Sequence, residues 1–415
     1  MLETYFVAPK TLKRLRTGPS APYIDGFAAI LKENGYSPAS AVRYLRAAAH
    51  LGHFLSSRSE TFIDMDATTP EVFRHHLPTC CCPDSNGGRV NHHTYFGVKR
   101  FRQYLVQRGV CRSNSASTAE PDEPMFIAGF RHWLEVHRGA AQSTRKQYCR
   151  GASDLLKALG HDPHRWDSQQ VREFFLGRAG RCGTGTIEKQ VTAVRAFLRY
   201  LIAQGYCRAD LDRAVPTLAH WRLASLPRYL TSAQVERLLA ACEGDSPGRI
   251  RDRAIILLLL RLGLRAGDVA GMRIADLEWD NASVRVSGKG RYEVRLPLPQ
   301  DVGDALLRYL ECRPEVARSD KLFVSSIAPH GPFASGDGVS SVVKHALARA
   351  GVQAPAKGAH LLRHTAATEM LRQGVSLEQI GSVLRHRSVD TSAYYAKVDV
   401  ALLRQIAQPW PEVLR

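Results

Sequence analysis

The sequence predicts a mainly α-helical protein of two or three domains, the last of which also contains a small antiparallel sheet. At 415 residues, the chain is longer than one hydrophobic core usually supports. Apolar residues recur at helical spacing, as in Val194, Phe197 and Leu201. Strict alternation occurs in Ser283–Ser287 and again in Tyr292–Leu296. These patterns together favour helical domains followed by one mixed α+β domain.

The first half contains the same helical pattern twice. Five residues of the first copy align at a constant offset (148 − 44 = 104) with five of the second: Ser40, Tyr44, Arg46, Leu51 and Leu55 with Thr144, Tyr148, Arg150, Leu155 and Leu159. Gly109 and Gly205, each at an expected helix C-terminus, align at 205 − 109 = 96. The smaller offset indicates a longer, Cys-rich insert in the first copy. We favour a duplicated helical domain over chance similarity of amphipathic helices.

Composition changes mark the expected boundaries between domains. Ser113–Pro124 is rich in Ser, Ala, Pro and acidic residues and is typical of a linker. A second, basic linker is expected over Ala209–Arg228, where two prolines occur. The predicted domains are therefore 1–112, 124–208 and 229–415, the first as a repeat of the second.

Local signals predict the elements of the last domain. Thr231 and Gln234 have capping-box spacing at the start of a helix. A buried helix is expected over Ile250–Leu262, ending at Gly263. The two alternating stretches form a hairpin joined by Gly288-Lys289-Gly290, and helices resume near Val339.

The charge indicates a polyanionic partner. There are 57 Lys+Arg against 39 Asp+Glu, for a formal net charge of +18. A merely solvated basic surface is the alternative, but the basic residues recur in every segment, which favours an extended nucleic-acid footprint. No apolar run is long enough for a membrane span, and Met1–Thr4 does not begin a signal peptide, so a cytoplasmic protein is expected.

Nine cysteines, an odd number without a secretory signal, indicate reduced thiols. Cys80–Cys82 lies near four histidines, His75, His76, His92 and His93, which raises the hypothesis of a zinc site. Adjacent cysteines fit poorly around one tetrahedral ion, and C-x-x-C pairs are absent. We therefore expect neither a metal nor a cofactor.

Five motifs stand in order in the last domain and together resemble the signature of the tyrosine recombinases, or phage integrases. They are Gly263-Leu264-Arg265-Ala266-Gly267-Asp268-Val269, Gly288-Lys289-Gly290, His360-Leu361-Leu362-Arg363-His364-Thr365, Leu384-Arg385-His386, and Tyr395. The resemblance is strong over Leu230–Lys397 and weaker over Pro124–Tyr206, which is similar to the family's core-binding helical domain. It implies helical N-terminal DNA-binding domains and a catalytic domain.

The resemblance implies an enzyme that cuts and rejoins duplex DNA at specific sites, serving a mobile element. Tyr395 would form a 3′-phosphotyrosine without ATP or metal. Arg265 and Arg363 suit bidentate contact with phosphate oxygens. The other expected catalytic residues are His360 for proton transfer, Lys289 for protonating the leaving oxygen, and His386 for support of the phosphate. Asp268 would hold the site together.

Competing interpretations of the individual residues are weaker. Tyr395 lies nine residues after His386, as in the family pattern, whereas Tyr394 points about 100° away on a helix and is expected to pack. His360 and His364 lack the glutamate of an H-E-x-x-H metal motif, and His364 is expected to be a structural hydrogen-bonding residue. Gly-Lys-Gly lacks the other residues of a phosphate-binding P-loop.

Two departures from the family pattern stand beside these residues. Arg385 replaces a glycine that is frequent there, which adds a phosphate contact or alters the turn. Gly267-Asp268 stands where a small residue and Glu are frequent. The tail Val398–Ile406 has a helical apolar face, expected to dock either on a neighbouring protomer or on its own domain.

Two other functions remain open at this stage, a type IB topoisomerase with the same chemistry and a non-catalytic DNA-binding regulator. We expect duplex DNA as partner, self-association on DNA as a tetrameric synapse, and accessory proteins. The sequence does not indicate the target site or the direction of the reaction.

Overall fold

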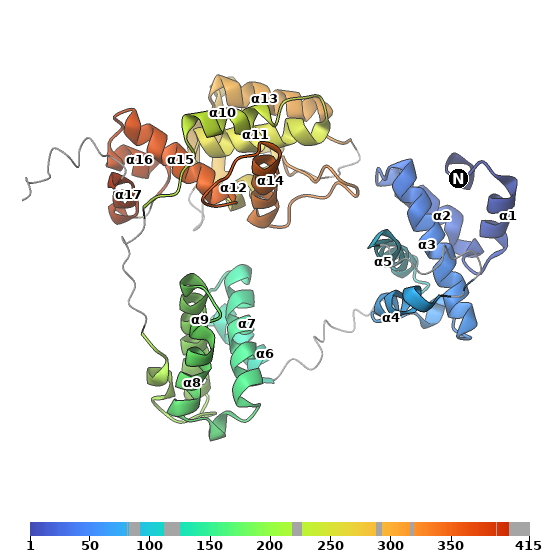
Figure 1. The fold of residues 1–415 in the computed structure, drawn as a ribbon, viewed down its shortest axis with the longest axis horizontal. Helices are drawn as coiled ribbons and strands as arrows, with labels where there is room; N and C mark the ends of the chain where they lie inside the picture. The colour runs from blue at the N-terminus through green and yellow to red at the C-terminus, as the bar shows by residue number, and fades with distance from the viewer. Residues whose placement is uncertain are drawn as a thin grey trace, which may run out of the picture. The chain divides into compact units, whose positions relative to one another are not determined.

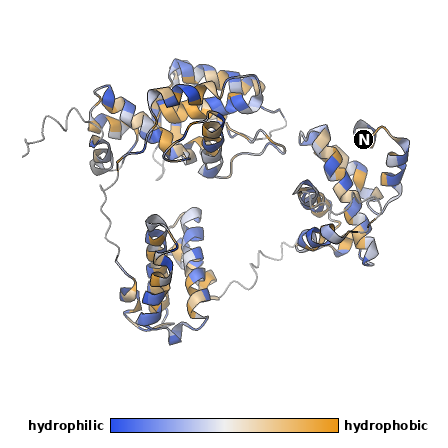
Figure 2. Ribbon diagram, in the orientation of Figure 1, coloured by the Kyte–Doolittle hydropathy of each residue, from blue (hydrophilic) through white to orange (hydrophobic). Residues whose placement is uncertain are grey.

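The computed structural model describes residues 1–80, 82, 92–111, 125–217, 226–287, 293–315, 319–386 and 388–397. These residues are mostly helical and contain one three-stranded antiparallel sheet, as predicted (Figure 1). Buried side chains form separate hydrophobic cores in three stretches of chain, and each stretch has its own apolar residues (Figure 2). We call them the N-terminal group (1–111), the middle group (125–217) and the C-terminal group (226–397).

The described residues of the N-terminal group form five α-helices built around the pairing of α3 with α5. Pro38 begins α3, and the Ser37 hydroxyl accepts a hydrogen bond from the Ser40 amide at 3.3 Å, which caps the helix. The helices are α1 (Pro9–Thr17), α2 (Ala21–Glu33), α3 (Pro38–Ser57), α4 (Thr69–His76) and α5 (His92–Gln107).

The middle group contains four α-helices in the same succession and is a compact unit by itself. Here α7 pairs with α9, as α3 does with α5. Asp167 and Gln170 form a reciprocal capping box that starts α8. The helices are α6 (Met125–Val136), α7 (Gln142–Leu159), α8 (Ser168–Ala179) and α9 (Thr184–Ala203).

The two groups share the same aromatic contacts at their centres. The ring centroids of Phe27 and Tyr104 lie 5.6 Å apart, and those of Phe130 and Tyr200 lie 5.6 Å apart as well. Each tyrosine also faces a glycine of another helix. A Cβ added to Gly26 would lie 2.2 Å from the Tyr104 hydroxyl, and a Cβ added to Gly129 would lie 2.2 Å from the Tyr200 hydroxyl, so neither position has room for a side chain. Equivalent helices therefore approach each other in the same way.

The C-terminal group surrounds the buried helix α11 with further helices and the sheet. Strand order is β1-β2-β3, with Ser283 paired to Pro297 and Ser287 to Glu293. The elements are α10 (Ser232–Ala240), α11 (Pro247–Arg261), α12 (Ala266–Gly271), β1 (Leu277–Glu278), β2 (Ser283–Ser287), β3 (Glu293–Pro297), α13 (Gln300–Cys312), α14 (Gly336–Arg349), α15 (Ala359–Arg372), α16 (Leu377–Val383) and α17 (Val389–Ala396).

Several local predictions for this group are confirmed with small shifts, but helices resume at Gln300 with α13 and not near Val339, because the helical spacing of Val302, Leu306 and Tyr309 was missed. Thr231 and Gln234 form the predicted capping box, and the first predicted strand has the observed bounds. The buried helix starts three residues earlier than predicted (250 − 247 = 3), because the Ser246 hydroxyl caps it and Pro247 fits its first turn. Strand β1 was not predicted, since two residues are too few to show alternation.

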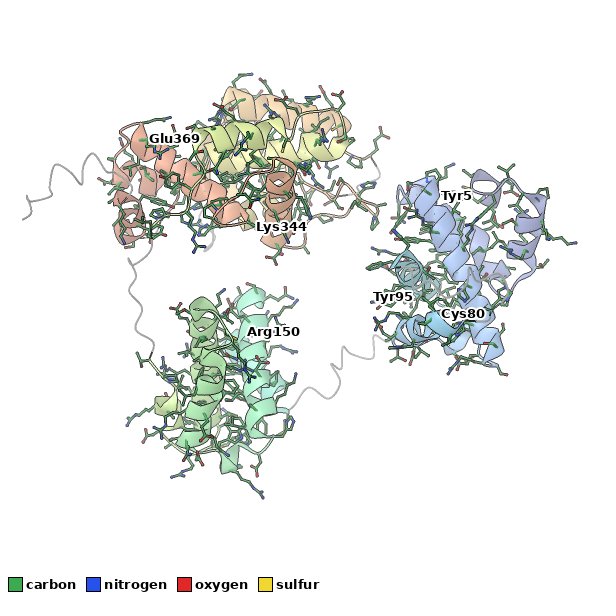
Figure 3. All side chains as sticks on the ribbon, in the orientation of Figure 1. Tyr5, Cys80, Tyr95, Arg150, Lys344 and Glu369 are labelled. Carbon is green, nitrogen blue, oxygen red and sulfur yellow. The ribbon has the colours of Figure 1, made fainter. Side chains whose placement is uncertain are left out.

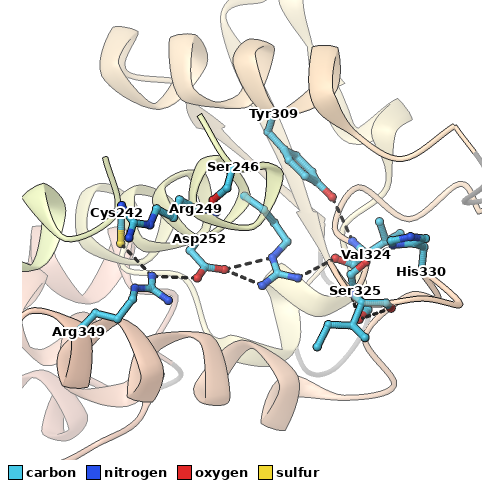
Figure 4. Close-up of polar contacts among 11 residues, drawn as sticks. Cys242, Ser246, Arg249, Asp252, Tyr309, Val324, Ser325, His330 and Arg349 are labelled. Atoms are coloured by element: carbon cyan, nitrogen blue, oxygen red, sulfur yellow. Dashed lines mark hydrogen bonds and ion pairs between the residues drawn. The ribbon is translucent and has the colours of Figure 1, made fainter. Parts of the chain in front are cut away.

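An ion-pair network centred on the buried Asp252 joins α11 to α14 (Figure 4). Asp252 accepts hydrogen bonds from Arg251 at 2.6 Å and from Arg349 at 3.0 Å, and its own side chain is 7% exposed. Arg251 also donates to the carbonyl oxygen of Val324 at 3.1 Å, while the Val324 amide donates to the Tyr309 hydroxyl at 3.2 Å. The network thereby fixes the segment after α13 to the central helix.

Several predicted features lie outside the described residues. They are Lys289 with its flanking glycines, the linker Ser113–Pro124, part of the second linker, and the tail Val398–Ile406. Among the described helices, none combines the length and apolar character needed to cross a membrane.

Candidate active site

Tyr395 lies on α17 with its phenol buried in the C-terminal group. The side chain is 2% exposed, and its hydroxyl lies 2.9 Å from Nδ1 of His364 on α15. Burial raises the pKa of Tyr395 to about 12, with the charge of Arg363 acting in the opposite direction. The phenol is therefore protonated at neutral pH and needs a base before it can act as a nucleophile.

His364 is placed to be that base. Burial lowers its pKa to about 4, and the charges of His360 and Arg363 act in the same direction. The imidazole is consequently neutral at pH 7 and can accept the phenolic proton at Nδ1 in the appropriate tautomer. The neighbouring Tyr394 makes a different contact, donating its hydroxyl to the carbonyl oxygen of Leu226 at 2.9 Å.

Arg363 is buried and joins two of the motifs. Its guanidinium donates hydrogen bonds to the carbonyl oxygens of Gly263 and Leu384. Gly263 has φ of 57°, and a Cβ there would lie 2.3 Å from Cδ2 of Leu384. Only glycine meets both requirements, so this position controls how closely the two motifs approach.

Arg265 and Asp268 hold the other side of the same turn. Arg265 donates to the carbonyl oxygen of Arg385 at 3.1 Å, and its own amide donates to Asp268 at 3.1 Å. Asp268 also forms an ion pair with Arg385 at 2.5 Å, and the two side chains are 8% and 9% exposed. Asp268 thus connects the start of α12 to the turn between α16 and α17.

His386 stacks on the phenol from the neighbouring turn. Its ring is parallel to that of Tyr395, with centroids 6.2 Å apart, and its Nδ1 lies 2.9 Å from the Ser392 hydroxyl. Burial lowers the pKa of His386 to about 4, assisted by Arg363, Arg265 and His360. The ring is neutral at pH 7 and held in orientation.

His360 lies one turn before His364, with ring centroids 4.5 Å apart. Loss of water around the ring, and then the charges of Arg363 and Arg265, lowers the pKa of His360, although part of the side chain is exposed. Arg265 likewise contributes, after burial, to lowering the pKa of Arg363 to about 10. The described residues therefore bring the positive charges of Arg265 and Arg363 and three imidazoles close to one phenol, an arrangement suited to an anion and to proton transfer.

Comparison with known proteins identifies this arrangement. The description "Phage integrase family" matches residues 228–401, and "Phage integrase, N-terminal SAM-like domain" matches residues 127–205. The chain is 34% identical to an integrase/recombinase of Sinorhizobium fredii named y4rA, over 98% of both chains. The chain belongs to the tyrosine recombinase family. This recombinase is also 26% identical to the tyrosine recombinase XerD of Lacticaseibacillus casei, over 65% of its own length and 92% of XerD.

Solved structures agree in fold. A lambda integrase dimer bound to a COC′ core site superposes with a TM-score of 0.52 at 18% identity, covering 69% of this chain and 98% of that chain. XerH bound to palindromic difH has a TM-score of 0.52 at 19% identity, covering 73% and 92%. As a member of its family, this recombinase is a DNA breaking-and-rejoining enzyme.

Of the site residues predicted from sequence, the structure brings together Arg265, Asp268, His360, Arg363, His386 and Tyr395 through direct contacts or mutual charge effects. Lys289 lies between β2 and β3, outside the described residues. Sequence reasoning gave His364 a structural role only and did not identify the phenol as its partner. Its position directly after Arg363 in the motif was the available signal.

Proposed function

We propose that this recombinase cuts and rejoins duplex DNA at specific sites through a 3′-phosphotyrosine formed by Tyr395. The observation that carries the proposal is the 2.9 Å contact between the Tyr395 hydroxyl and His364. The positive charge of Arg363 lowers the pKa of the same phenol, and the charge of Arg265 acts in turn on Arg363. A nucleophile, a neutral base and two cations are what attack on a phosphodiester requires.

In the proposed reaction the phenolic oxygen bonds to phosphorus while the bond from phosphorus to the 5′ oxygen breaks. The phenolic proton passes to an imidazole, His364 or His360, and the leaving 5′ oxygen takes a proton from Lys289. Arg265 and Arg363 hold the non-bridging oxygens, on which charge grows, and His386 supports them. Attack by a 5′-hydroxyl on the phosphotyrosine reverses the step and rejoins the strand without ATP.

Asp268 acts as a positioning residue in this scheme. It caps α12 next to Arg265 and pairs with Arg385, which carries the carbonyl that Arg265 contacts. Any movement of the carboxylate would therefore displace Arg265. We place Asp268 outside direct contact with DNA.

We also propose three domains, 1–112, 124–208 and 229–415, the first two of which bind DNA. Support comes from the separate cores, from the aromatic contacts that the N-terminal and middle groups share, and from the match of residues 127–205 to the SAM-like domain. Lambda integrase and XerH have been solved on DNA, the former as a dimer. We propose that this recombinase likewise assembles on DNA, as a tetrameric synapse, and serves a mobile element with accessory proteins.

Covalent trapping tests the nucleophile. A nicked duplex that loses a short fragment after cleavage will accumulate the protein–DNA adduct. We expect Tyr395→Phe to abolish the adduct and Tyr394→Phe, the matched control, to retain it, as resolved on a denaturing gel. Adduct formation by Tyr395→Phe but not by Tyr394→Phe would reverse the assignment.

A second experiment separates recombination from topoisomerase activity. Two duplexes with different labels, both carrying the target site, are incubated with the protein, and supercoiled DNA is incubated in parallel. Joined molecules carrying both labels support a recombinase, whereas relaxation without exchange supports a topoisomerase. Sequencing the junctions formed in cells then identifies the sites and the element served.

A further inference from the structure

Four potential metal ligands converge in the N-terminal group, which contains none of the residues proposed for the reaction. His50 lies on α3, His76 ends α4, and Cys80 and Cys82 follow it. One donor atom from each lies within 4.8 Å of all the others. Figure 3 labels Cys80 beside α4. His76, Cys80 and Cys82 are close in sequence, but His50 comes from a separate helix, so its convergence with them is a product of folding.

We propose that His50, His76, Cys80 and Cys82 bind one structural Zn²⁺ ion. Two imidazole nitrogens and two thiolates are a common ligand set of structural zinc, and zinc favours this borderline-soft combination. The ion closes the fold of the N-terminal group and takes no part in strand exchange.

The distances fit a tetrahedral ion. Zn–N bonds of about 2.0 Å and Zn–S bonds of about 2.3 Å place tetrahedral donors about 3.3–3.8 Å from one another. Nε2 of His50 lies 3.0 Å from Sγ of Cys80, and Nε2 of His76 lies 3.3 Å from Sγ of Cys82. These two pairs lie within about 0.5 Å of the tetrahedral values, and the widest pairs of the set, at up to 4.8 Å, must close by about 1 Å when the ion binds.

The surroundings favour a bound ion as well. The Cys82 amide donates to Sγ of Cys80 at 3.3 Å, a contact that stabilises a thiolate. The ring centroids of Phe54 and His76 lie 4.7 Å apart, and those of Phe73 and His50 lie 4.9 Å apart. These ring contacts hold both imidazoles in orientation, and the four ligands are each half-buried. Neither cysteine is in a disulfide.

The middle group has an ion pair where the N-terminal group has these ligands. Asp154 on α7 pairs with Arg178 on α8 at 3.2 Å, linking the helices that correspond to α3 and α4. Asp154 aligns with His50 at the offset found for the rest of this helix (154 − 50 = 104). One copy thus joins its helices by an ion pair, and the other joins them by a metal.

Metal content is the direct test. The full chain is purified under reducing conditions without a chelator or a histidine tag, incubated with ZnCl₂, desalted and measured by mass spectrometry for metals. We expect one equivalent of zinc. A zinc content well under one equivalent per chain in the folded wild-type protein would overturn the proposal. This result does not depend on whether any variant folds.

Ligand identity is tested with Co²⁺ in place of zinc. We expect the visible bands of tetrahedral cobalt with thiolate ligands, lost in Cys80→Ser and in Cys82→Ser but retained in Cys182→Ser, a half-buried cysteine of the middle group. Equal loss in Cys182→Ser, or retention in both other variants, would contradict the assignment. Hydrogen exchange should also show that a chelator exposes α4 amides and leaves α8 amides unchanged.

Discussion

At the scale of single residues, Arg385 combines backbone strain with a buried ion pair. Its φ is 55°, a conformation that costs a residue with a Cβ about 1 kcal/mol. Two of its nitrogens, Nε and Nη1, are buried without a hydrogen-bond partner among the described residues. The ion pair with Asp268 offsets these costs and holds the turn that contacts Arg265.

Arg385→Gly should destabilise the site although it relieves the strain. It leaves Asp268 buried without its counter-ion, and breaking a buried pair costs about 3–5 kcal/mol, against about 1 kcal/mol regained. Hydrogen exchange of α12 and α15 amides measures the local free energy of opening. Adding Asp268→Asn should restore most of the loss, since asparagine keeps the acceptor for the Arg265 amide without the charge. Unchanged protection in the single variant would contradict this account.

His364→Ala should slow formation of the covalent adduct about 10²-fold or more, the usual contribution of a general base. The substitution leaves the phenol without the acceptor 2.9 Å away. Single-turnover rates on the nicked duplex measure the effect, gel-shift assays check that DNA binding persists, and His345→Ala is an exposed control. A near-normal rate in His364→Ala together with a slow His360→Ala would assign the base to His360.

At the scale of elements, short-range signals predicted the fold well. The Thr231–Gln234 capping box and the alternation of Ser283–Ser287 depend only on nearby residues, so the sequence shows them directly. Contacts between distant residues were not predictable. Arg363 donates hydrogen bonds to backbone carbonyl oxygens 100 and 21 residues away. Every residue has such a carbonyl, so the sequence does not indicate which ones will accept.

The possible metal ligands show the same limit. His76, Cys80 and Cys82 were noticed because they are close in sequence, whereas His50 lies 26 residues before His76 (76 − 50 = 26). Ring contacts of His50 and Phe54 on α3 with Phe73 and His76 on α4 bring it to them. The sequence argued against a metal because adjacent cysteines fit poorly around one ion and C-x-x-C pairs are absent; it did not indicate that the non-adjacent Cys80 and Cys82 would meet His50.

Asp252→Asn should strongly weaken the contact between α11 and α14. It leaves the buried Arg251 without its carboxylate, a loss that costs about 3–5 kcal/mol, and it also removes the link to Arg349, whose side chain is 33% exposed. Asp245→Asn removes the exposed pair with Arg308 and should cost at most about 1 kcal/mol. Hydrogen exchange of α11 and α14 amides compares the two variants, and equal effects would refute a special role for the buried network.

At the scale of the whole molecule, the two helical groups raise the question of how much DNA the protein covers. Similarity to y4rA spans 98% of both chains and so includes the N-terminal group. The formal charge of +18 is in keeping with an extended contact with phosphates. A second copy of a DNA-binding unit would lengthen that contact.

A chain beginning at Met125 should protect a shorter stretch of DNA than the full chain. Losing one set of phosphate contacts should also weaken binding about 10-fold or more at about 0.1 M salt and flatten its salt dependence. Footprinting and binding titrations measure both, with full-length Tyr395→Phe as the uncleaving control. An identical footprint and salt slope would mean that the N-terminal group serves a protein partner instead.

Arg363 is anchored by two backbone carbonyl oxygens, which carry no net charge. These partners fix the position of the Arg363 guanidinium but do not neutralise its positive charge. The charge is therefore repelled by that of nearby Arg265. The protein thus holds two like charges close together at some loss of its own stability. A phosphate entering between them would relieve that repulsion, so that the arrival of substrate would also tighten the protein around it.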